Sequence, residues 1–311
     1  MSYTDTEQRL KDGGIVILDG GTGTELERRG VTMDPGAWCG PASLENADLL
    51  ESIHRDYIAA GADIITTNTY ASSRLRLGPG GFGDQVAEIN RAAVAAAQAA
   101  RQASGREDIL IAGCLSHSAA VIAGTSYPDL ANAPTEGAMA DAFGELAQLL
   151  AGEGCDLIIL EMMFYPERMG PAFAAAIATG LPVWAGFSAR RGTDGQVLSF
   201  APEPDIPFAE IVDVLKDHDV AAAGIMHTGA DVIGDALDIL NAEFSRPLMA
   251  YPDSGYFKSP SWQFEEVMPP GELHRFAAQW IDQGVQIVGG CCGLSPEHIA
   301  ALAPFKKPEI L

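Results

Sequence analysis

The sequence predicts an α/β fold, and within that class a closed (β/α)8 barrel of eight parallel strands surrounded by helices. Short apolar, β-branched runs recur along the whole chain and alternate with stretches rich in Ala, Leu and Glu. The runs are apolar throughout, which is typical of parallel strands that are covered by helices. Eight such strand–helix units in 311 residues fit a barrel, whose usual size is about 250 residues or more. An open doubly wound sheet is the alternative.

The strands are expected, in chain order, at residues 15–21, 63–70, 109–116, 156–162, 182–188, 221–227, 247–252 and 285–291. Between them, apolar residues recur at helical spacing, for example over 49–58 and 139–150. Gly61, Gly154 and Gly284 each stand between a helix and a strand, where glycine readily adopts the left-handed cap.

Loops are expected where glycine, proline or irregular patterns interrupt these units, at 78–83, 125–135 and 251–270, the last after the seventh strand. No linker or low-complexity segment divides the chain. Residues 1–311 are therefore expected to form a single domain.

Composition excludes several classes of partner. The 19 Lys and Arg against 42 Asp and Glu give a net charge of −23, which would repel nucleic acid and anionic membranes. No apolar run reaches the roughly 18 residues of a membrane span, and the polar N-terminus lacks a signal-peptide core. Five cysteines, an odd number, argue against a disulfide framework. A cytoplasmic protein with small-molecule partners is expected.

Polar side chains stand at the ends of most expected strands, and the carboxyl ends of barrel strands are where active sites lie. These residues are Asp19, Asn68, Tyr70, His117, Glu161, Ser188, His227, Asp253 and the pair Cys291-Cys292. Any one of them could simply meet water at the end of a strand. Together they indicate a ring of functional groups around one pocket.

The adjacent thiols of Cys291 and Cys292, preceded by two glycines, are the strongest local signal. Thiolates are soft ligands that suit zinc, and His227 at another strand end is the natural third ligand. One imidazole and two thiolates would leave the fourth position open, as in catalytic zinc sites. A pair of small core residues or a vicinal disulfide remains an alternative.

The segment from Asp19 to Glu25 is a glycine-rich turn that leads from the first strand into a helix. Thr22 and Glu25 have the spacing of a capping box. The turn at Gly20, Gly21 and Thr22 would present backbone N–H groups to an anion such as an amino-acid carboxylate. It matches neither a Walker motif nor a dinucleotide fingerprint, and an ordinary turn is the alternative.

Other candidates divide into carboxylates and aromatic rings. Asp19 and Glu161 could hold an ammonium group, and Asn68 belongs to the same substrate site. Trp38 and Tyr70 could form an aromatic wall for a cationic methyl donor, because onium groups bind ring faces. A salt bridge for Glu161 and core packing for the rings are the alternatives.

The remaining histidines give weaker signals. His54, His218, His274 and His298 lie among polar residues and are expected to be solvated, and His117 could reach the pocket.

Several motifs in order make the chain resemble the homocysteine S-methyltransferase family over residues 17–302. They are Leu18-Asp19-Gly20-Gly21, the segment 24–30, Thr67-Asn68-Thr69-Tyr70, Leu160-Glu161, the segment 251–255, and Gly289-Gly290-Cys291-Cys292-Gly293. The resemblance implies a TIM barrel, a catalytic zinc, and methyl transfer from an onium or cobalamin donor to the thiol of homocysteine, giving methionine.

Two residues depart from the family pattern. The family's third zinc thiolate comes from a Gly-Ile-Asn-Cys strand end, which here reads Gly224-Ile225-Met226-His227. Asp253 stands where the family usually has Asn. A neutral imidazole in place of a thiolate would make the metal centre more positive by one charge.

We therefore expect zinc held by His227, Cys291 and Cys292, and an onium donor such as S-methylmethionine, S-adenosylmethionine or a betaine-like compound. A different thiol acceptor, or a binding protein with a degenerate site, is the alternative. A metal-dependent hydrolase is disfavoured, because no His-x-His pair is present.

Overall fold

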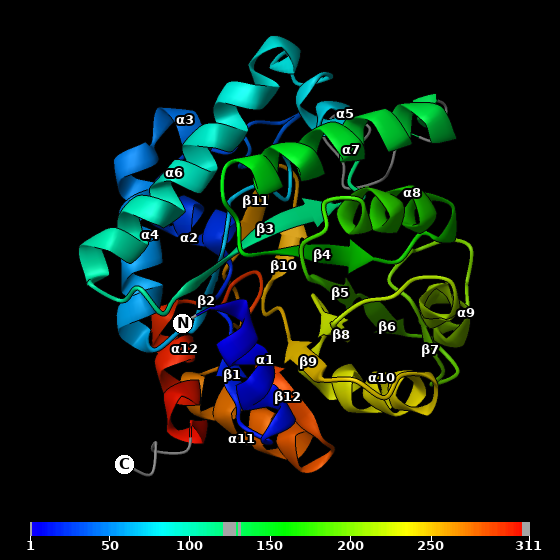
Figure 1. Cartoon of the computed structure of the whole chain (residues 1–311). Coiled ribbons are helices and arrows are strands. Elements are labelled where there is room, and N and C mark those ends of the chain that lie inside the picture. The colour runs from blue at the N-terminus through cyan, green and yellow to red at the C-terminus, as the bar shows by residue number, and fades with distance from the viewer. Residues whose placement is uncertain (1, 121–128, 130–131, 307–311) are drawn as a thin grey trace.

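The computed structural model describes residues 2–120, 129 and 132–306, so most of the predicted loop 125–135 lies outside it. Eight parallel strands form one ring in the order of the chain (Figure 1). They are β1 (Val16–Ile17), β2 (Ile64–Thr66), β3 (Leu110–Ser116), β4 (Leu157–Met163), β5 (Val183–Phe187), β8 (Ala222–Met226), β9 (Leu248–Tyr251) and β12 (Val285–Val288). A parallel bridge from Leu18 to Ile64 joins the first strand to the second and closes the ring. The predicted (β/α)8 barrel is confirmed, and the open sheet is excluded.

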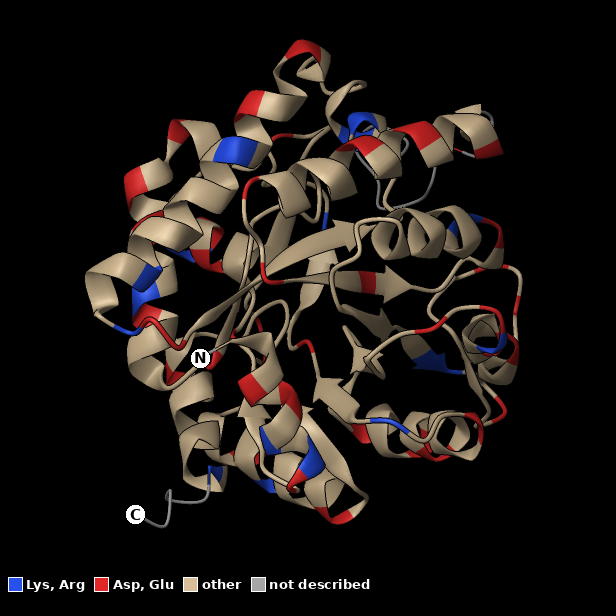
Figure 2. Cartoon of the chain, in the orientation of Figure 1, with Lys and Arg blue, Asp and Glu red and all other residues tan. Residues whose placement is uncertain are grey.

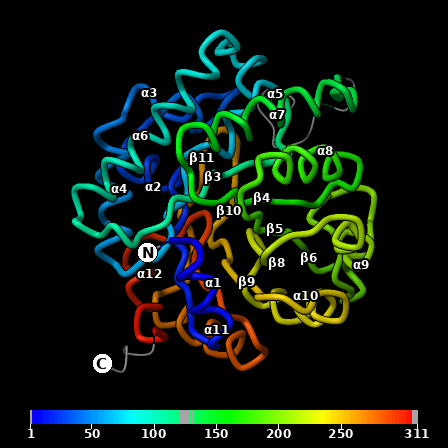
Figure 3. The backbone as a smooth tube through the Cα atoms, in the orientation of Figure 1, coloured from blue at the N-terminus to red at the C-terminus, as the bar shows by residue number. Residues whose placement is uncertain are grey.

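Helices surround this ring, and the colour in Figure 3 follows the chain around it in sequence order. The helices are α1 (Tyr3–Lys11), α2 (Thr22–Arg28), α3 (Ala42–Glu45), α4 (Ala47–Ala60), α5 (Arg74–Leu77), α6 (Val86–Ser104), α7 (Glu136–Gly152), α8 (Pro166–Ile177), α9 (Phe208–Val212), α10 (Ala230–Glu243), α11 (Pro270–Asp282) and α12 (Pro296–Leu302). Short 3-10 turns lie at Gly83–Gln85, Asp213–Lys216 and Ala303–Phe305. Within the part of the chain that is described, no helix combines the length and apolarity needed to cross a membrane.

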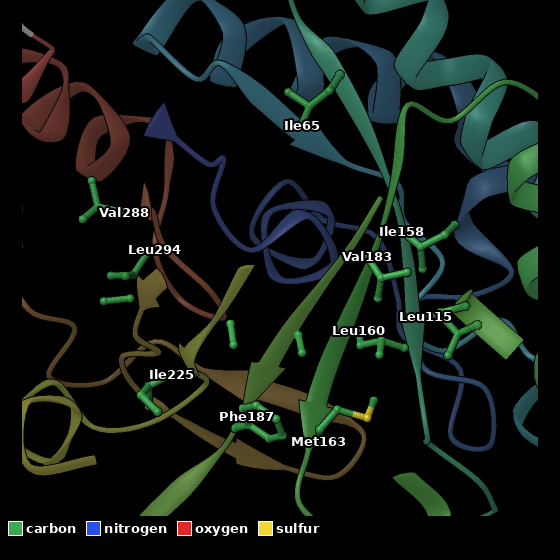
Figure 4. Packing of buried hydrophobic residues seen from close by; sticks show 14 of the residues in the cluster. Ile65, Leu115, Ile158, Leu160, Met163, Val183, Phe187, Ile225, Val288 and Leu294 are labelled. Carbon is green, nitrogen blue, oxygen red and sulfur yellow. The ribbon is translucent and has the colours of Figure 1, made fainter. Parts of the chain in front are cut away.

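Alternate residues of each strand face opposite sides, so the ring has two apolar layers. Leu110 and Ala112 of β3 point into the barrel, whereas Ile111 packs outward against the helices. Ile158, Val183 and other outward-facing residues form the layer between strands and helices that Figure 4 shows. Both layers are buried, which explains why the strands are apolar throughout.

Helix α1 packs at the amino-terminal entry of the barrel. Its Leu10 joins the interior cluster. The indole nitrogen of Trp184 in β5 donates a hydrogen bond of 2.9 Å to the Tyr3 hydroxyl. The opposite, carboxyl end of the barrel is thereby left as the open one.

Two antiparallel hairpins extend the loops at that open end. The first pairs β6 (Ala189–Arg191) with β7 (Val197–Ser199) after β5. The second pairs β10 (Tyr256–Lys258) with β11 (Ser261–Gln263), so part of the predicted loop 251–270 is a hairpin. Acidic residues are spread over the outer helices and loops (Figure 2), as the net charge of −23 requires.

Candidate metal and substrate site

A cavity of about 580 Å³ opens at the carboxyl ends of the strands. Most residues predicted for the site line this cavity: Asp19, Gly20, Gly21, Thr22, Trp38, Asn68, Tyr70, His117, Glu161, His227, Asp253, Cys291 and Cys292. The expectation is wrong for Ser188, which is fully buried and donates a hydrogen bond of 2.9 Å to the Met226 carbonyl instead. The volume is that of an ordinary small-molecule site and leaves room for two small substrates together. The barrel thus gathers residues that are up to 273 positions apart, from Asp19 to Cys292.

The three predicted metal ligands converge. The Cys291 Sγ atom lies 3.6 Å from His227 Nδ1 and 4.0 Å from Cys292 Sγ. All three ligand atoms lie within 4.8 Å of one another. Both thiols are free, so a vicinal disulfide is not formed. Both line the cavity, and Cys291 also packs against the apolar cluster inside the barrel.

Backbone geometry turns these side chains towards the cavity. His227 follows β8 with φ 43°, and Met162 and Trp38, which also line the cavity, have φ 53° and 51°. Residues other than glycine rarely have a positive φ, and such strained backbone conformations occur often at functional sites. The Cys291 amide donates a hydrogen bond of 2.8 Å to the Pro252 carbonyl, which ties the cysteine segment to the loop after β9.

The charges in this cluster favour a bound cation. The neighbouring Cys292 sulfur first, and burial second, raise the pKa of Cys291 well above that of an ordinary thiol. Burial lowers the pKa of His227, but Asp253 and Cys291 outweigh it and raise that pKa to about 9. Two adjacent buried thiolates therefore need a positive partner, and a divalent metal supplies one when it displaces the protons.

Asp253 lies on the far side of the imidazole. Its Oδ2 atom is 3.9 Å from His227 Nε2, while Nδ1 faces Cys291. Histidines that bind metals commonly point their second nitrogen at a carboxylate, which fixes the ring orientation. The two residues that depart from the family pattern are therefore in contact with each other.

Asp19, which is buried, and Glu161, which is half-buried, are carboxyl groups beside the cluster. Thr66 donates to Asp19 through its backbone N–H (2.7 Å) and its hydroxyl (3.1 Å). The Cys114 thiol donates to Glu161 at 2.8 Å. Burial is the main reason why the pKa of each carboxyl is raised. A cationic group placed between them would restore both negative charges.

The first turn is held against the cysteine segment. The Gly293 amide donates to Thr24 Oγ1 at 3.0 Å, and a Cβ atom on Gly21 would lie 2.6 Å from the Cys291 carbonyl oxygen. The predicted capping box is wrong, because Gly21 is the N-cap and Glu25 pairs instead with Arg28 and Arg29. The buried hydroxyl of Thr22 lacks a hydrogen-bond partner and lines the cavity.

Aromatic rings form another part of the cavity wall. The rings of Trp38 and Tyr70 lie 6.1 Å apart at 89°, and those of Trp38 and Phe257 lie 6.2 Å apart at 87°. Asn68 lines the cavity too, but its amide donates to the Cys39 carbonyl and to Ser43. Asn68 thus fixes the loop that carries Trp38.

The prediction of solvated histidines is wrong for two of the four. His54 and His298 are buried, at 0% and 6% exposure. His117 lines the cavity, where its Nε2 accepts from the Phe164 amide at 3.0 Å.

Sequence reasoning missed four residues of the cavity or its support, namely Thr66, Cys114, Arg76 and Arg168. Thr66 and Cys114 could have been found, because each stands two residues beyond an inward-facing position of its strand, Ile64 and Ala112. Nothing in the local sequence marks the two arginines.

The fold and the cavity define a (β/α)8-barrel protein with a candidate metal centre at the carboxyl ends of its strands. The family model described as homocysteine S-methyltransferase matches residues 16–305. The chain therefore belongs to the homocysteine S-methyltransferase family, and its enzyme class is that of the S-methyltransferases.

Individual relatives are distant but aligned over most of their length. A selenocysteine Se-methyltransferase from Brassica oleracea var. italica is 28% identical, over 96% of this chain and 91% of that protein. Betaine–homocysteine S-methyltransferase 1 from Bos taurus is 28% identical, over 97% and 74%. The metallated form of the homocysteine methyltransferase MmuM from Escherichia coli matches with a TM-score of 0.74 and 24% identity, over 95% and 97%, which supports the fold.

Proposed function

We propose that this protein transfers a methyl group from an onium donor to the thiol of homocysteine, giving methionine, with zinc held by His227, Cys291 and Cys292. The observation that carries the proposal is the convergence of these three ligand atoms, within 4.8 Å, beside two carboxyl groups and an aromatic wall. Metal, ammonium and methyl donor would each have a place in one cavity.

The donor atoms suit zinc in spacing and in kind. With zinc–sulfur bonds of about 2.3 Å and a zinc–nitrogen bond of about 2.0–2.1 Å, a tetrahedral site needs sulfurs about 3.8 Å apart and a sulfur–nitrogen separation of about 3.5 Å. The structure has 4.0 and 3.6 Å. When bound, zinc with an open position would hold the acceptor's sulfur as a thiolate at neutral pH.

The chain's own residues would bind and orient the amino acid. The ammonium group fits between the carboxyl groups of Asp19 and Glu161, where its positive charge would oppose the burial that raises the pKa of each. The carboxylate fits the first turn, where the Thr22 hydroxyl has no protein partner. When its ammonium and carboxylate groups are both held, the amino acid can present its sulfur to the methyl donor in only one orientation. Much of the rate acceleration would therefore come from positioning.

The donor would face Trp38, Tyr70 and Phe257. The positive charge of a sulfonium or quaternary ammonium is attracted to ring faces. The thiolate attacks the methyl carbon, a carbon–sulfur bond forms, and the bond to the onium atom breaks with its electron pair. The leaving group is a neutral sulfide or amine, so no general acid is needed.

A second candidate is methyl transfer to a different thiol or to a selenol. Two observations favour keeping it. One is the His227–Asp253 pair, which replaces the pattern expected at both positions. The other is that relatives at 28% and 27% identity are named for selenocysteine.

The test combines elemental analysis with a screen of donors and acceptors. The purified protein should contain about one zinc per chain and form methionine from homocysteine with S-methylmethionine, S-adenosylmethionine or betaine. Faster turnover of selenocysteine than of homocysteine would favour the second candidate. A protein with neither zinc nor turnover would be the degenerate binding protein.

The proposal extends to the domain organisation and the cellular location of the protein. Residues 1–311 would form one domain, supported by the ring order of all eight strands. The five free cysteines support a reducing, cytoplasmic location.

A further inference from the structure

Two arginines are buried in the cavity wall without a carboxylate partner. Arg76 on α5 is 8% exposed and Arg168 on α8 is 6% exposed, and both line the cavity. Among the described residues, no Asp or Glu forms an ion pair with either. Of the residues that the structure does not describe, only Glu309 near the end of the sequence is acidic. Buried charges without a partner are costly, so these two guanidinium groups are suited to bind an anion.

The protein contacts of these arginines leave donors free. Arg76 Nη1 donates to the Ala119 carbonyl at 3.1 Å, but its buried Nε has no partner. The Arg168 guanidinium lies 4.9 Å from the centre of the Tyr165 ring. These contacts place both arginines around the segment after β3 that carries His117 and Ala119.

Among the described residues of this wall, no other group supplies the negative charge. His117 is neutral, because burial and then the positive charge of Arg168 lower its pKa to about 3. Arg190, a third arginine of the cavity, differs because its guanidinium pairs with Asp205. Asp34 is the carboxylate whose charge acts on Arg76, but its Oδ1 accepts from the amides of Gly36 and Ala37 at 2.8 and 2.7 Å.

The arginines adjoin the wall to which the donor's cation is assigned. Burial raises the pKa of Tyr70, and Arg76 lies near enough for its positive charge to oppose that rise. The aromatic wall of Trp38 and Tyr70 and the carboxylate of Glu161 attract a cation. The cavity is therefore polarised, with its anion-binding part beside its cation-binding part, which is the complement of a small zwitterion.

We propose that Arg76 and Arg168 bind the carboxylate of a zwitterionic onium methyl donor and so select such donors over onium compounds that lack a carboxylate. The inference rests on the proposed function, in which the first turn already holds the acceptor's carboxylate. The second anion site then belongs to the donor.

Binding is measured calorimetrically on the zinc-loaded protein with two pairs of probes, betaine with choline and S-methylmethionine with trimethylsulfonium. Betaine and choline differ mainly in the carboxylate, whereas trimethylsulfonium lacks both the carboxylate and the ammonium group of S-methylmethionine, so the betaine pair decides. The wild-type protein should bind the carboxylate member of each pair at least about tenfold more tightly. Equal affinities, or no binding of either zwitterion, would overturn the inference.

The variants Arg76→Gln and Arg168→Gln should lower the affinity for betaine and for S-methylmethionine by about 10- to 100-fold. Their affinity for trimethylsulfonium should stay within about twofold of the wild-type value. The exposed Arg91→Gln, on α6, is the matched control and should change nothing. Equal weakening of both members of a pair would show a merely structural role. Arg76→Lys keeps the charge, and it should keep most of the preference if the Gln variant fails to fold.

Failure of the proposed function has a different signature. A protein that binds zwitterions through the arginines but forms no methionine with any donor would contradict the methyl transfer and leave the anion site standing. A protein that forms methionine with unchanged donor preference in Arg76→Gln would contradict the anion site alone.

Discussion

His227 Nδ1 is the atom that completes the proposed metal site, 3.6 Å from the Cys291 sulfur. An imidazole and two thiolates neutralise both charges of a zinc ion, whereas three thiolates would leave it with a net charge of −1. Asp253 lies 3.9 Å from the other ring nitrogen of His227. Its carboxylate places a negative charge next to the imidazole, outside the direct ligands of the metal. The two substitutions relative to the family pattern are thus best understood as one exchange, with a thiolate replaced by an imidazole that a carboxylate orients.

The first prediction concerns the thiols. Cys291→Ser and Cys292→Ser should each lower zinc affinity and the rate of methyl transfer by more than about 100-fold. Loss of a direct ligand should cost more affinity than loss of a residue that only orients a ligand, which costs about 10- to 100-fold. Zinc content after dialysis and the rate of methionine formation check this. Cys155→Ser, at a buried free thiol outside the cavity, is the control and should keep its zinc. Full zinc content in either site variant would refute the ligand assignment.

The second prediction concerns His227→Cys. A third thiolate should bind zinc more tightly at neutral pH and make the centre less positive by one charge. The bound acceptor thiol then becomes less acidic, so the pH at which methyl transfer reaches half its maximum should rise. A pH–rate profile with zinc titrations measures both effects. Unchanged zinc affinity and an unchanged profile would show that His227 is not a ligand.

Much of the site could be predicted at this scale, because strand ends in a barrel share one face. Asp19, Glu161, His227 and the cysteine pair were all expected there, and all line the cavity. Arg76 and Arg168 could not be predicted. In the sequence they look like ordinary surface arginines of helices, and only tertiary packing buries them to 8% and 6%.

At the scale of elements, the first strand–helix turn and the cysteine segment support each other. Thr24 and Gly293 are hydrogen-bonded, and the Tyr57 hydroxyl of α4 donates to the Leu294 carbonyl at 3.1 Å. The turn therefore serves two purposes, since it lines the substrate cavity and positions the metal ligands.

The third prediction tests this coupling. In Gly21→Ala the new Cβ would lie 2.6 Å from the Cys291 carbonyl oxygen and 2.9 Å from the Cys292 Cα atom, both backbone atoms. The cysteine segment must shift, so zinc affinity should fall at least about tenfold and stability by about 1–3 kcal/mol. Gly144→Ala in α7, where a Cβ meets nothing within 4 Å, should keep zinc and be neutral or stabilising. Zinc affinity and urea unfolding distinguish the two variants, and a normal zinc site in Gly21→Ala would contradict the coupling.

Element prediction succeeded where a hydrophobic period or a glycine cap marks the boundary. Gly61 ends α4 with φ 110° directly before β2, as expected. Element prediction failed where contacts with distant parts of the chain determine the local structure. The Thr22–Glu25 capping box does not form, because Glu25 is drawn to two arginines. The β10–β11 hairpin has only three residues per strand, which is too short for a periodic signal.

At the scale of the molecule, closure of the barrel fixes the distances within the site. The metal ligands come from the loops after β8 and β12, and β9 between them carries the loop with Asp253. The fold class followed from alternation of strands and helices, but closure itself depends on the Leu18–Ile64 bridge and short contacts around it, which no local pattern encodes.

The fourth prediction concerns stability and pH. His54 is fully buried, neither ring nitrogen has a partner, and burial lowers its pKa to about 4. In the unfolded chain the histidine has a pKa of about 6.5, so it binds a proton at pH values where His54 in the folded chain stays neutral. The free energy of unfolding therefore falls as the pH drops from about 6.5 towards 4. Relative to His54→Leu, the wild-type protein should lose about 2 kcal/mol of unfolding free energy between about pH 7.5 and 5.0.

Urea unfolding of both proteins at the two pH values measures that difference, because contributions from other titrating groups cancel between them. His218→Leu, at a half-buried position, controls for the loss of one imidazole. A pH-independent difference between wild type and His54→Leu would mean that His54 is protonated inside the fold.

X-ray absorption at the zinc edge, recorded with and without homocysteine, tests most directly whether His227, Cys291 and Cys292 hold a metal to which the acceptor's sulfur binds. We expect two sulfurs at about 2.3 Å and one nitrogen at about 2.0–2.1 Å in the free protein, with the sulfur count rising to three on addition of homocysteine. A sulfur count that does not change with homocysteine, or a zinc shell made of nitrogen and oxygen alone, would contradict this expectation.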